Sequence, residues 1–458
     1  MTFAAVDQIE NIDIHQFLKI YQMNGFTRNL SENSDMWQYI SKLKEMDPTA
    51  RYLKYLLIDE LGYGAVQPVA ADGGAYPAAR RSNLQEASAR YKEWAWTVDV
   101  PRVLENKTGS DLMQYAKPLA TELDNKQIAY ARLKCIELQG DGTGAIGIAT
   151  AVPTVSSGKL VVTISNTSAN AGRSSIRWFQ EGDLVRAYGP DASTVTYDGT
   201  LVAAYYKITN VDEDNYQVTL QGYNSSNVAV TADGSNTLAA ADVIYRLGVT
   251  ANDLGDYDGT TDESENLSEN MVGLEGLLNA GGSLVHGIAR TGAIKGTRRD
   301  LGGVTIDTIH FQRALSKLKV KAGKGRYTYP NAFMNDKTYD TLVEAREVDR
   351  RFHSIEDTDR GVKGIGYVHG RDKVEFMPDE FVHEQRIWIL PQGKGALCYA
   401  GSDPKQVKPN GNDPFHLTTS TSGAGYGRDQ QTFFEQTGVL LTKHPAACGV
   451  IENFAASE

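Results

Sequence analysis

Residues 110–144, SDLMQYAKPLATELDNKQIAYARLKCIELQGDGTG, are the stretch that decides the fold. Apolar side chains recur along it at helical spacing, which predicts the longest helix of the chain, beginning at Asp111 with Ser110 as its N-cap. Pro118 lies inside this pattern and predicts a kink or a new start, because an internal proline costs a helix on the order of 3 kcal/mol. The glycines of residues 140–144 supply the positive φ that ends a helix, so a sharp exit follows.

The sequence before this helix divides into an arm and a loop. Helical spacing over residues 37–44 and again over 51–61 predicts two helices, which Asp47-Pro48 separates. Residues 62–81 are rich in glycine, alanine and proline and show no period, as expected of an irregular loop. Apolar and polar side chains then alternate over residues 91–103, which predicts a strand.

A β-rich insertion follows the long helix. Short runs of strand-forming residues separated by turn residues fill 153–247, and they predict a small antiparallel barrel or sandwich as a separate module. Helical spacing returns at 267–278 and 307–320, and strands are expected at 387–390 and 438–441. The predicted fold class is therefore α+β, without the repeated βαβ units of a Rossmann fold.

Composition narrows the class of protein. Hydrophobic residues make up 41% and charged residues 22% of the 458 residues, ordinary values for a soluble chain of several units. No apolar run is long enough to span a bilayer and the first residues do not resemble a signal peptide, so we expect a protein that stays in the cytoplasm where it is made. The net charge of -11 disfavours tight binding of nucleic acid but is compatible with a container for DNA. Cys135, Cys398 and Cys448 lack metal or disulfide spacing and are expected to be buried.

The motifs for chemistry are weak. Residues 142–147 match G-x-G-x-x-G, but they follow a helix instead of a strand, which disfavours a dinucleotide site. Residues 323–326 lack the other positions of a P-loop, and the acidic residues between 253 and 265 lack calcium-loop spacing and are more typical of a solvated loop. No zinc-protease or hydrolase motif occurs. We therefore predict no catalytic, cofactor-binding or metal-binding residues and no enzymatic activity.

One basic segment lies on and after the helix expected at 307–320. It could face DNA or an acidic neighbouring subunit, and a solvated helix face is the plain alternative. Its cations are Arg313, Lys317, Lys319, Lys321, Lys324 and Arg326.

The order of these parts resembles that of the major capsid proteins of tailed bacteriophages, whose coat fold is shared with encapsulins and herpesvirus capsid floors. In that family a long spine helix commonly ends at a Gly-Asp-Gly turn, which Gly140-Asp141-Gly142 matches. Later segments resemble the family's Gly-Leu helix, its strand ending in Met-Asn and further strands of its axial domain. These segments are residues 273–277, 332–339, 366–368, 374–376, 387–390 and 438–454.

The resemblance implies an arm, an extended loop, a peripheral domain built on the spine helix and an axial domain, with the β module inserted between the last two. The implied boundaries are 1–60 for the arm and its helices, 61–108 for the extended loop, 109–150 for the peripheral domain, 151–250 for the inserted domain, 251–410 for the axial domain and 411–458 for the returning strands.

The resemblance also implies that the chain self-assembles into hexamers and pentamers of an icosahedral head that encloses double-stranded DNA. The implied partners are further copies, scaffolding and portal proteins, in some members a decoration protein, and DNA held without sequence specificity, in a virion assembled in the host cytoplasm without a membrane. Tyr91, Trp94 and Trp96 of the extended loop are expected to cover a neighbouring subunit, with burial in the chain's own core as the alternative. The β module is expected to face outward and either to strengthen contacts between capsomers or to replace a separate cement protein.

Three other readings stay open. An encapsulin-like compartment would share the architecture and enclose protein cargo, although the large insertion favours a phage. An adhesion or tail-fibre-like protein could bind carbohydrate through the β module, although the chain lacks fibrous repeats. An unfamiliar enzyme could assemble its site from distant residues.

Overall fold

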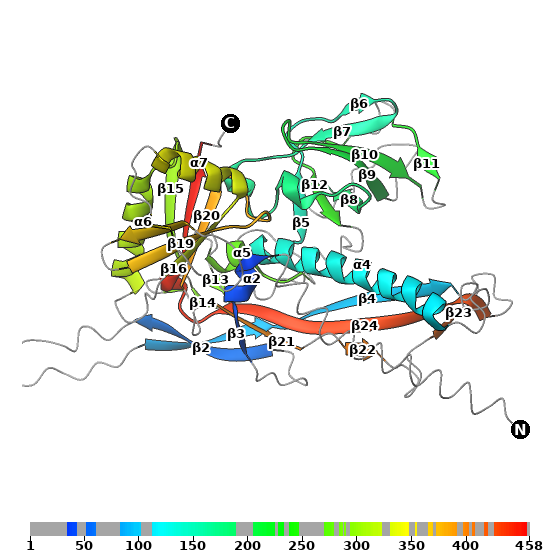
Figure 1. Ribbon diagram of the computed structural model, residues 1–458, viewed down its shortest axis with the longest axis horizontal. Coiled ribbons are helices and arrows are strands. Elements are labelled where there is room, and N and C mark those ends of the chain that lie inside the picture. The colour runs from blue at the N-terminus through cyan, green and yellow to red at the C-terminus, as the bar shows by residue number, and fades with distance from the viewer. Residues whose placement is uncertain are drawn as a thin grey trace, which may run out of the picture.

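The structure is a computed structural model that mixes helices and strands, as the predicted α+β class requires. A long helix separates a layer of long strands from a β barrel, and a second sheet with two helices lies at one end of both (Figure 1). The described residues are 34–43, 52–60, 83–101, 112–188, 205–224, 228–232, 238–246, 270–278, 284–286, 288–289, 294–322, 330–347, 353–354, 365–369, 372–391, 397–402, 405–407, 416–419 and 426–455.

The spine helix α4 spans Leu112–Gln139 and confirms the longest predicted helix. The helix continues through Pro118, so no new helix starts there. Proline removes one backbone hydrogen bond, and the hydrogen bonds of the neighbouring turns hold the helix together across that position. The predicted N-cap, Ser110, lies outside the described residues. Gly142 and Gly144 follow the helix at φ +100° and +76°, the left-handed conformation that the glycine turn predicts.

Two long antiparallel strands lie beneath the spine helix (Figure 1). Strand β4 spans Lys92–Pro101, as predicted, and it pairs along its whole length with β24, which spans Tyr426–Thr442 and is much longer than the strand expected at 438–441. The chain thus joins its first quarter to its end in one sheet. The other strands of this sheet are β1 (Ser41–Leu43), β21 (Leu397–Gly401), β22 (Lys405–Val407) and β23 (His416–Thr419).

The first N-terminal helix is shorter than expected. It is the single turn α2, Asp35–Tyr39, and the chain then turns into β1 instead of continuing to residue 44. Ile40 already has extended backbone angles, φ -78° and ψ 122°. Residues 41–43 pair in parallel with β21, and this pairing supplies hydrogen-bond partners for backbone groups that would otherwise bond within a longer helix.

The second N-terminal helix, expected at 51–61, is wrong. This stretch forms strand β2, Tyr52–Glu60, which is antiparallel to β3, Asn83–Arg90. Along β2 the side chains alternate between exposed, as at Leu56, and buried, as at Leu57. Apolar residues on both faces fit a helix as well as a strand, and the pairing with a distant segment decides between them.

The insertion is a closed antiparallel barrel, which confirms the barrel and excludes the sandwich. Its strands are hydrogen-bonded in the order β5-β12-β8-β9-β10-β7, and a bridge between Ala149 and Ile164 returns from β7 to β5. The first strand begins directly after the glycine turn, earlier than the boundary expected at 151. The strands are β5 (Ala145–Ile148), β6 (Thr154–Ser156), β7 (Lys159–Thr163), β8 (Leu184–Tyr188), β9 (Tyr205–Asp212), β10 (Gln217–Tyr223), β11 (Ala229–Val230) and β12 (Val243–Arg246).

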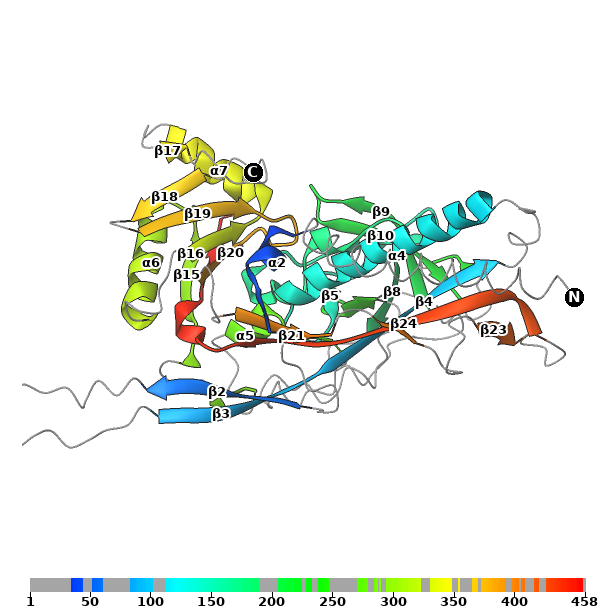
Figure 2. The ribbon, with the colours of Figure 1, turned by 60° about the horizontal axis from the view of Figure 1, so that its bottom comes forward.

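A mixed sheet has the order β15-β25-β20-β16-β19-β18-β17 (Figure 2). This sheet and its two helices are called the axial domain below, after the domain expected from the sequence. Helices α6, Thr308–Ala322, and α7, Asp336–Glu347, pack on one face through Phe311 and Leu342, and the helix expected at 307–320 is confirmed. The other face turns Trp388 into the main core of the chain. The strands are β15 (Thr297–Val304), β16 (Pro330–Met334), β17 (His353–Ser354), β18 (Ile365–His369), β19 (Asp372–Pro378), β20 (Arg386–Pro391) and β25 (Gly449–Phe454).

Short elements connect these bodies. The helix expected at 267–278 is shorter than predicted: residues 270–273 are described and are not helical, and only the single turn α5, Leu274–Leu278, forms within the described part. The hairpin of β13 (Leu284–Val285) and β14 (Ile288–Ala289) follows. Turns of 3-10 helix occur at Ser168–Asn170, Ile176–Trp178 and Pro445–Ala447. All three cysteines are buried and free, as expected. Among the described helices, none is long and apolar enough to cross a membrane.

Candidate assembly surfaces

The hairpin of β2 and β3 has one face that the chain covers and one that it leaves open. Leu57 is fully buried on the inner face, and Tyr55 makes an edge contact with the His286 ring. On the outer face Tyr52 is 44% and Leu56 59% exposed. Among the described strands, these two pair only with each other, so the hairpin relies on its inner face for support.

The aromatic residues predicted to cover a neighbouring subunit pack against the chain itself, with Tyr91 and Trp94 buried and Trp96 half-buried. Trp94 is buried and donates a hydrogen bond from its indole Nε1 to Glu137 Oε1 on the spine helix, at 2.9 Å. Trp96 stacks on Phe434 of β24, with ring centroids 5.7 Å apart. Tyr91 is buried as well. The structure therefore favours the alternative of burial in the chain's own core, and their contact with a neighbour stays a prediction.

A buried lysine reinforces this attachment of β4 to the spine helix. The Lys134 ammonium lies over the ring of Trp94 and 3.4 Å from Glu137 Oε2, with almost none of its side chain exposed. Burial lowers the pKa of Lys134 to about 7, and the carboxylate of Glu137 opposes this shift only in part. The spacing of Lys134 and Glu137, three residues apart, indicates an ion pair on one face of a helix. Nothing in the sequence indicates that this pair is buried.

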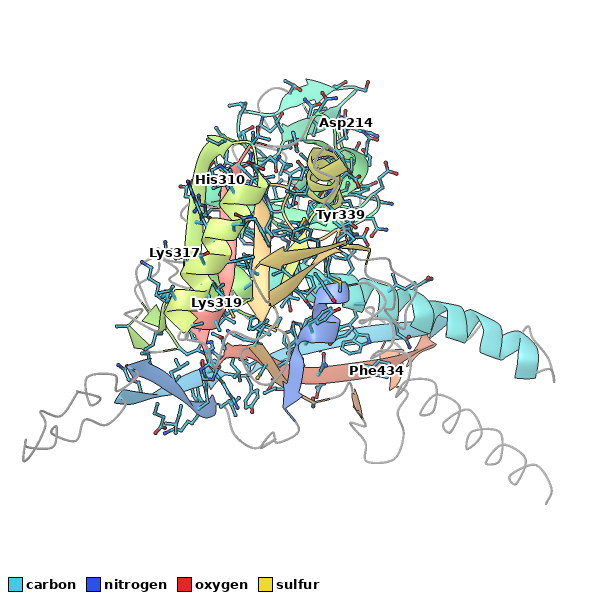
Figure 3. All side chains as sticks on the ribbon, turned by 60° about the vertical axis from the view of Figure 1, so that its left-hand side comes forward. Asp214, His310, Lys317, Lys319, Tyr339 and Phe434 are labelled. Atoms are coloured by element: carbon cyan, nitrogen blue, oxygen red, sulfur yellow. The ribbon has the colours of Figure 1, made fainter. Side chains whose placement is uncertain are left out.

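The predicted basic segment lies partly on the exposed face of α6 (Figure 3). Arg313 and Lys317 are exposed, whereas Lys319 and Lys321 are half-buried. Lys321 donates to the Gly296 carbonyl at 3.1 Å, and burial together with nearby lysines lowers the pKa of its ammonium to about 8. Lys324 and Arg326 lie outside the described residues, so the structure brings four of the six predicted cations onto one helix.

The two family motifs at the end of the spine meet in space. Asp141 accepts hydrogen bonds from the backbone N–H and the hydroxyl of Thr143, at 2.9 and 2.6 Å, and pairs with Arg173 of the barrel. A Cβ on Gly273, just before α5, would lie 2.2 Å from the Glu137 carbonyl oxygen, so only glycine allows this approach. The motif at 273–277 therefore packs on the glycine turn.

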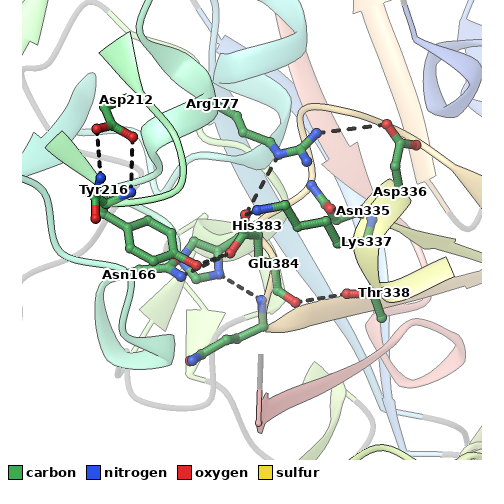
Figure 4. A network of polar contacts seen from close by, with 12 residues as sticks. Asn166, Arg177, Asp212, Tyr216, Asn335, Asp336, Lys337, Thr338, His383 and Glu384 are labelled. Atoms are coloured by element: carbon green, nitrogen blue, oxygen red, sulfur yellow. Dashed lines mark hydrogen bonds and ion pairs between the residues drawn. The ribbon is translucent and has the colours of Figure 1, made fainter. Parts of the chain in front are cut away.

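A polar junction joins the barrel to the axial domain, and sequence reasoning missed it (Figure 4). Glu384 is buried and accepts hydrogen bonds from two barrel residues, the Tyr216 hydroxyl at 2.6 Å and the Asn166 amide at 3.1 Å. Lys337 Nζ of α7 lies 3.4 Å from the same carboxylate, and Arg177 Nε of the barrel lies 3.9 Å from it. The carboxylate thus binds both modules at once.

The residues around Glu384 hold the loop that carries it. The Thr338 hydroxyl donates to the Glu384 carbonyl at 2.9 Å. The neighbouring His383 is buried, and burial together with the charge of Arg386 lowers its pKa to about 3, so it is neutral at ordinary pH. No sequence motif could have paired Glu384 with Asn166 and Tyr216, its partners in the barrel, which lie 218 and 168 residues away along the chain.

A second cluster of charged side chains also joins the axial domain to the insertion. Arg386 of β20 is 1% exposed, pairs with Glu275 of α5 and lies 3.7 Å from Glu452 of β25. Its guanidinium also donates to the Ser168 carbonyl of the insertion at 3.1 Å. A buried charge loses its hydration, so these partners must compensate it, and their geometry is correspondingly constrained. In the described part of the chain, no group of acids, histidines and cysteines is arranged to hold a metal ion.

No family model matches the chain, and no curated protein is similar to it in sequence. Solved structures with a similar course of the chain include a chain of the cyanophage A-1(L) capsid asymmetric unit, at 10% identity and a TM-score of 0.44, covering 92% of this chain and 93% of that one. A chain of the native GTA particle capsid is 10% identical with a TM-score of 0.40, covering 93% and 91%. A chain of the holo-SrpI encapsulin complex from Synechococcus elongatus PCC 7942 is 9% identical with a TM-score of 0.36, covering 92% and 86%.

Proposed function

We propose that this chain is the major capsid protein of a tailed bacteriophage, a subunit that assembles into hexamers and pentamers of an icosahedral head around double-stranded DNA. The observation that carries the proposal is the β2–β3 hairpin, whose outer face exposes Tyr52 and Leu56. A two-stranded sheet is marginal in water, and exposed large apolar residues on one are typical of a surface that a partner covers.

The positions of the other exposed apolar residues support a subunit with several neighbours. Ile128 on the spine helix is 52% exposed, Ile309 on α6 52% and Val320 on α6 85%. Ile128, the α6 residues and the hairpin lie on different bodies of the molecule, so a subunit with more than one neighbour would account for their exposure (Figure 1). When two different surfaces of identical copies pair head-to-tail, the copies form a closed ring if the rotation from one copy to the next returns to the first copy.

In this proposal the spine helix with β4 and β24 forms the peripheral domain, and the seven-stranded sheet forms the axial domain. The extended loop begins at β2, since residues 52–60 and 83–90 form one hairpin. The barrel is an outward module that strengthens contacts between capsomers, and the Glu384 junction holds it on the axial domain. The further partners are scaffolding and portal proteins, a decoration protein and the enclosed DNA, in a virion assembled in the host cytoplasm.

The contents of particles isolated from the producing cell test this proposal against the encapsulin alternative. We expect double-stranded DNA that resists nuclease until the shell is opened, without a preferred short sequence. Particles that hold a defined protein cargo and no protected DNA would favour the encapsulin. A chain that occurs only at the tip of a tail or fibre would overturn both.

A further inference from the structure

Helix α6 carries an exposed stripe with cations in its middle. Ile309, Arg313, Lys317 and Val320 follow one another at intervals of three or four residues, so they lie along one face of the helix. All four are exposed, Val320 by 85%. The helix contains no acidic residue, and in the described part of the chain no carboxylate forms an ion pair with Arg313 or Lys317.

Helix α7 carries the complementary charge on the same face of the axial sheet. Asp336 and Asp340 are exposed and one helical turn apart, which matches the spacing of the two cations on α6. Asp336 has only a long contact with Arg177, at 3.8 Å, and Asp340 has no ion pair within the described residues. Helix α6 packs toward the β15 edge of the sheet, whereas α7 packs on β19, toward the opposite edge.

We propose that α6 of one copy contacts α7 of the next copy around a ring of axial domains, with Arg313 and Lys317 opposite Asp336 and Asp340. The inference rests on the proposed function and names the surfaces that the ring uses. Because the two surfaces differ and lie toward opposite edges of one sheet, the contact is head-to-tail, as a closed ring requires. Complementary charges fix the register of such a contact and disfavour the reverse pairing.

The composition of the stripe favours a protein partner over DNA. Contacts to phosphate need cations and hydrogen-bond donors, and they gain nothing from large apolar residues. Here Ile309 and Val320 flank the cations at both ends. A protein interface buries such apolar residues and places charges beside them, which is the pattern of this stripe.

A charge swap within one chain tests the contact. Lys317→Glu and Asp340→Lys each place like charges opposite each other, and we expect each to lower the association constant of the ring contact by about tenfold. The double variant restores opposite charges in every interface, and we expect its assembled fraction to return to within about twofold of the natural chain. Sedimentation and particle counts by electron microscopy measure the assembled fraction. Lys317→Arg, which keeps the positive charge at the same position, is the matched control and should assemble normally.

Three results would overturn the contact while the shell itself stands. The double variant could assemble no better than the worse single variant, both single variants could assemble normally, or Lys317→Glu could form normal shells that retain less DNA. The last result would place the stripe against DNA. Thermal unfolding of each variant separates a lost contact from a lost fold. Failure of the natural chain to form shells under any condition would instead overturn the proposed function.

Discussion

Several of the buried charged side chains in the described part of the chain lie where two bodies meet. Glu384 is shared by the barrel and the axial domain, Arg386 by the axial sheet, α5 and the insertion, and Lys134 lies between β4 and the spine helix. Each group gives up hydration, so it contributes to stability only in one arrangement of its partners. Such groups favour a fixed orientation of the bodies more than they add to the total stability.

Substitution of Glu384 should loosen the barrel. Glu384→Gln removes the charge between Arg177 and Lys337, and we expect it to lower the free energy of unfolding by about 1–3 kcal/mol, because two cations lose a buried partner. Denaturant unfolding measures the loss, and hydrogen exchange should rise at Asn166 and Tyr216. Glu86→Gln, in the exposed pair with Lys54, is the matched control. An effect no larger than that of the control would argue against the junction.

The pH dependence of stability should contain a contribution from Lys134. Burial lowers its pKa to about 7 in the folded chain, against 10.5 for an unburied lysine. Between these values the unfolded chain binds more protons than the folded chain, so stability rises with pH there, by up to about 1.4 kcal/mol per pH unit. Lys134→Met should remove this rise. Equal slopes for both chains in denaturant unfolding from pH 7 to 10 would contradict it.

At the scale of elements, the sequence predicted best where a signal was long and local. The spine helix α4 has helical periodicity and a glycine stop, and both are properties of its own residues. The barrel strands were visible through alternation and turns, but closure depends on the bridge between Ala149 and Ile164, which no local pattern encodes. Strand β2 is predicted as a helix because its apolar residues lie on both faces. One face packs against the rest of the chain, as at Leu57, and the other is exposed, as at Leu56.

The same limit applies to the candidate sites. The sequence singles out Trp94 and Trp96, but only the structure shows that Trp94 bonds to the spine helix and that Trp96 stacks on Phe434 of β24. The cations of α6 could be read directly, because a run of basic residues on one helix is local. The acidic residues Asp336 and Asp340 of α7 can be related to these cations only once the structure shows that both helices pack on the same face of one sheet.

The two faces of strand β2 should respond differently to substitution. Leu56→Ser changes an exposed side chain, so we expect the isolated chain to keep its stability within about 0.5 kcal/mol while assembly falls. Leu57→Ala, on the buried face, should lower the free energy of unfolding by about 2–5 kcal/mol. Thermal unfolding and sedimentation measure the two effects. Normal assembly of Leu56→Ser would contradict the role given to the hairpin.

At the scale of the whole molecule, the chain is a set of bodies around one long axis. The helix α4 and the strands β4 and β24 form that axis, and the barrel, the axial sheet and the hairpin are attached to it at different places (Figure 1). The attachments inside the chain are buried and charged, whereas the outer faces of the hairpin and of α6 are exposed and partly apolar. A rigid subunit with several open surfaces is suited to a shell, in which many modest contacts add up.

Electron cryomicroscopy of particles formed by the purified chain, with scaffolding protein supplied, tests the central proposal most directly. We expect closed icosahedral shells of hexamers and pentamers, in which Tyr52 and Leu56 of the hairpin are buried against a neighbouring copy. A chain that stays a monomer or a small open oligomer under all these conditions, with the outer face of the hairpin in solvent, would contradict it.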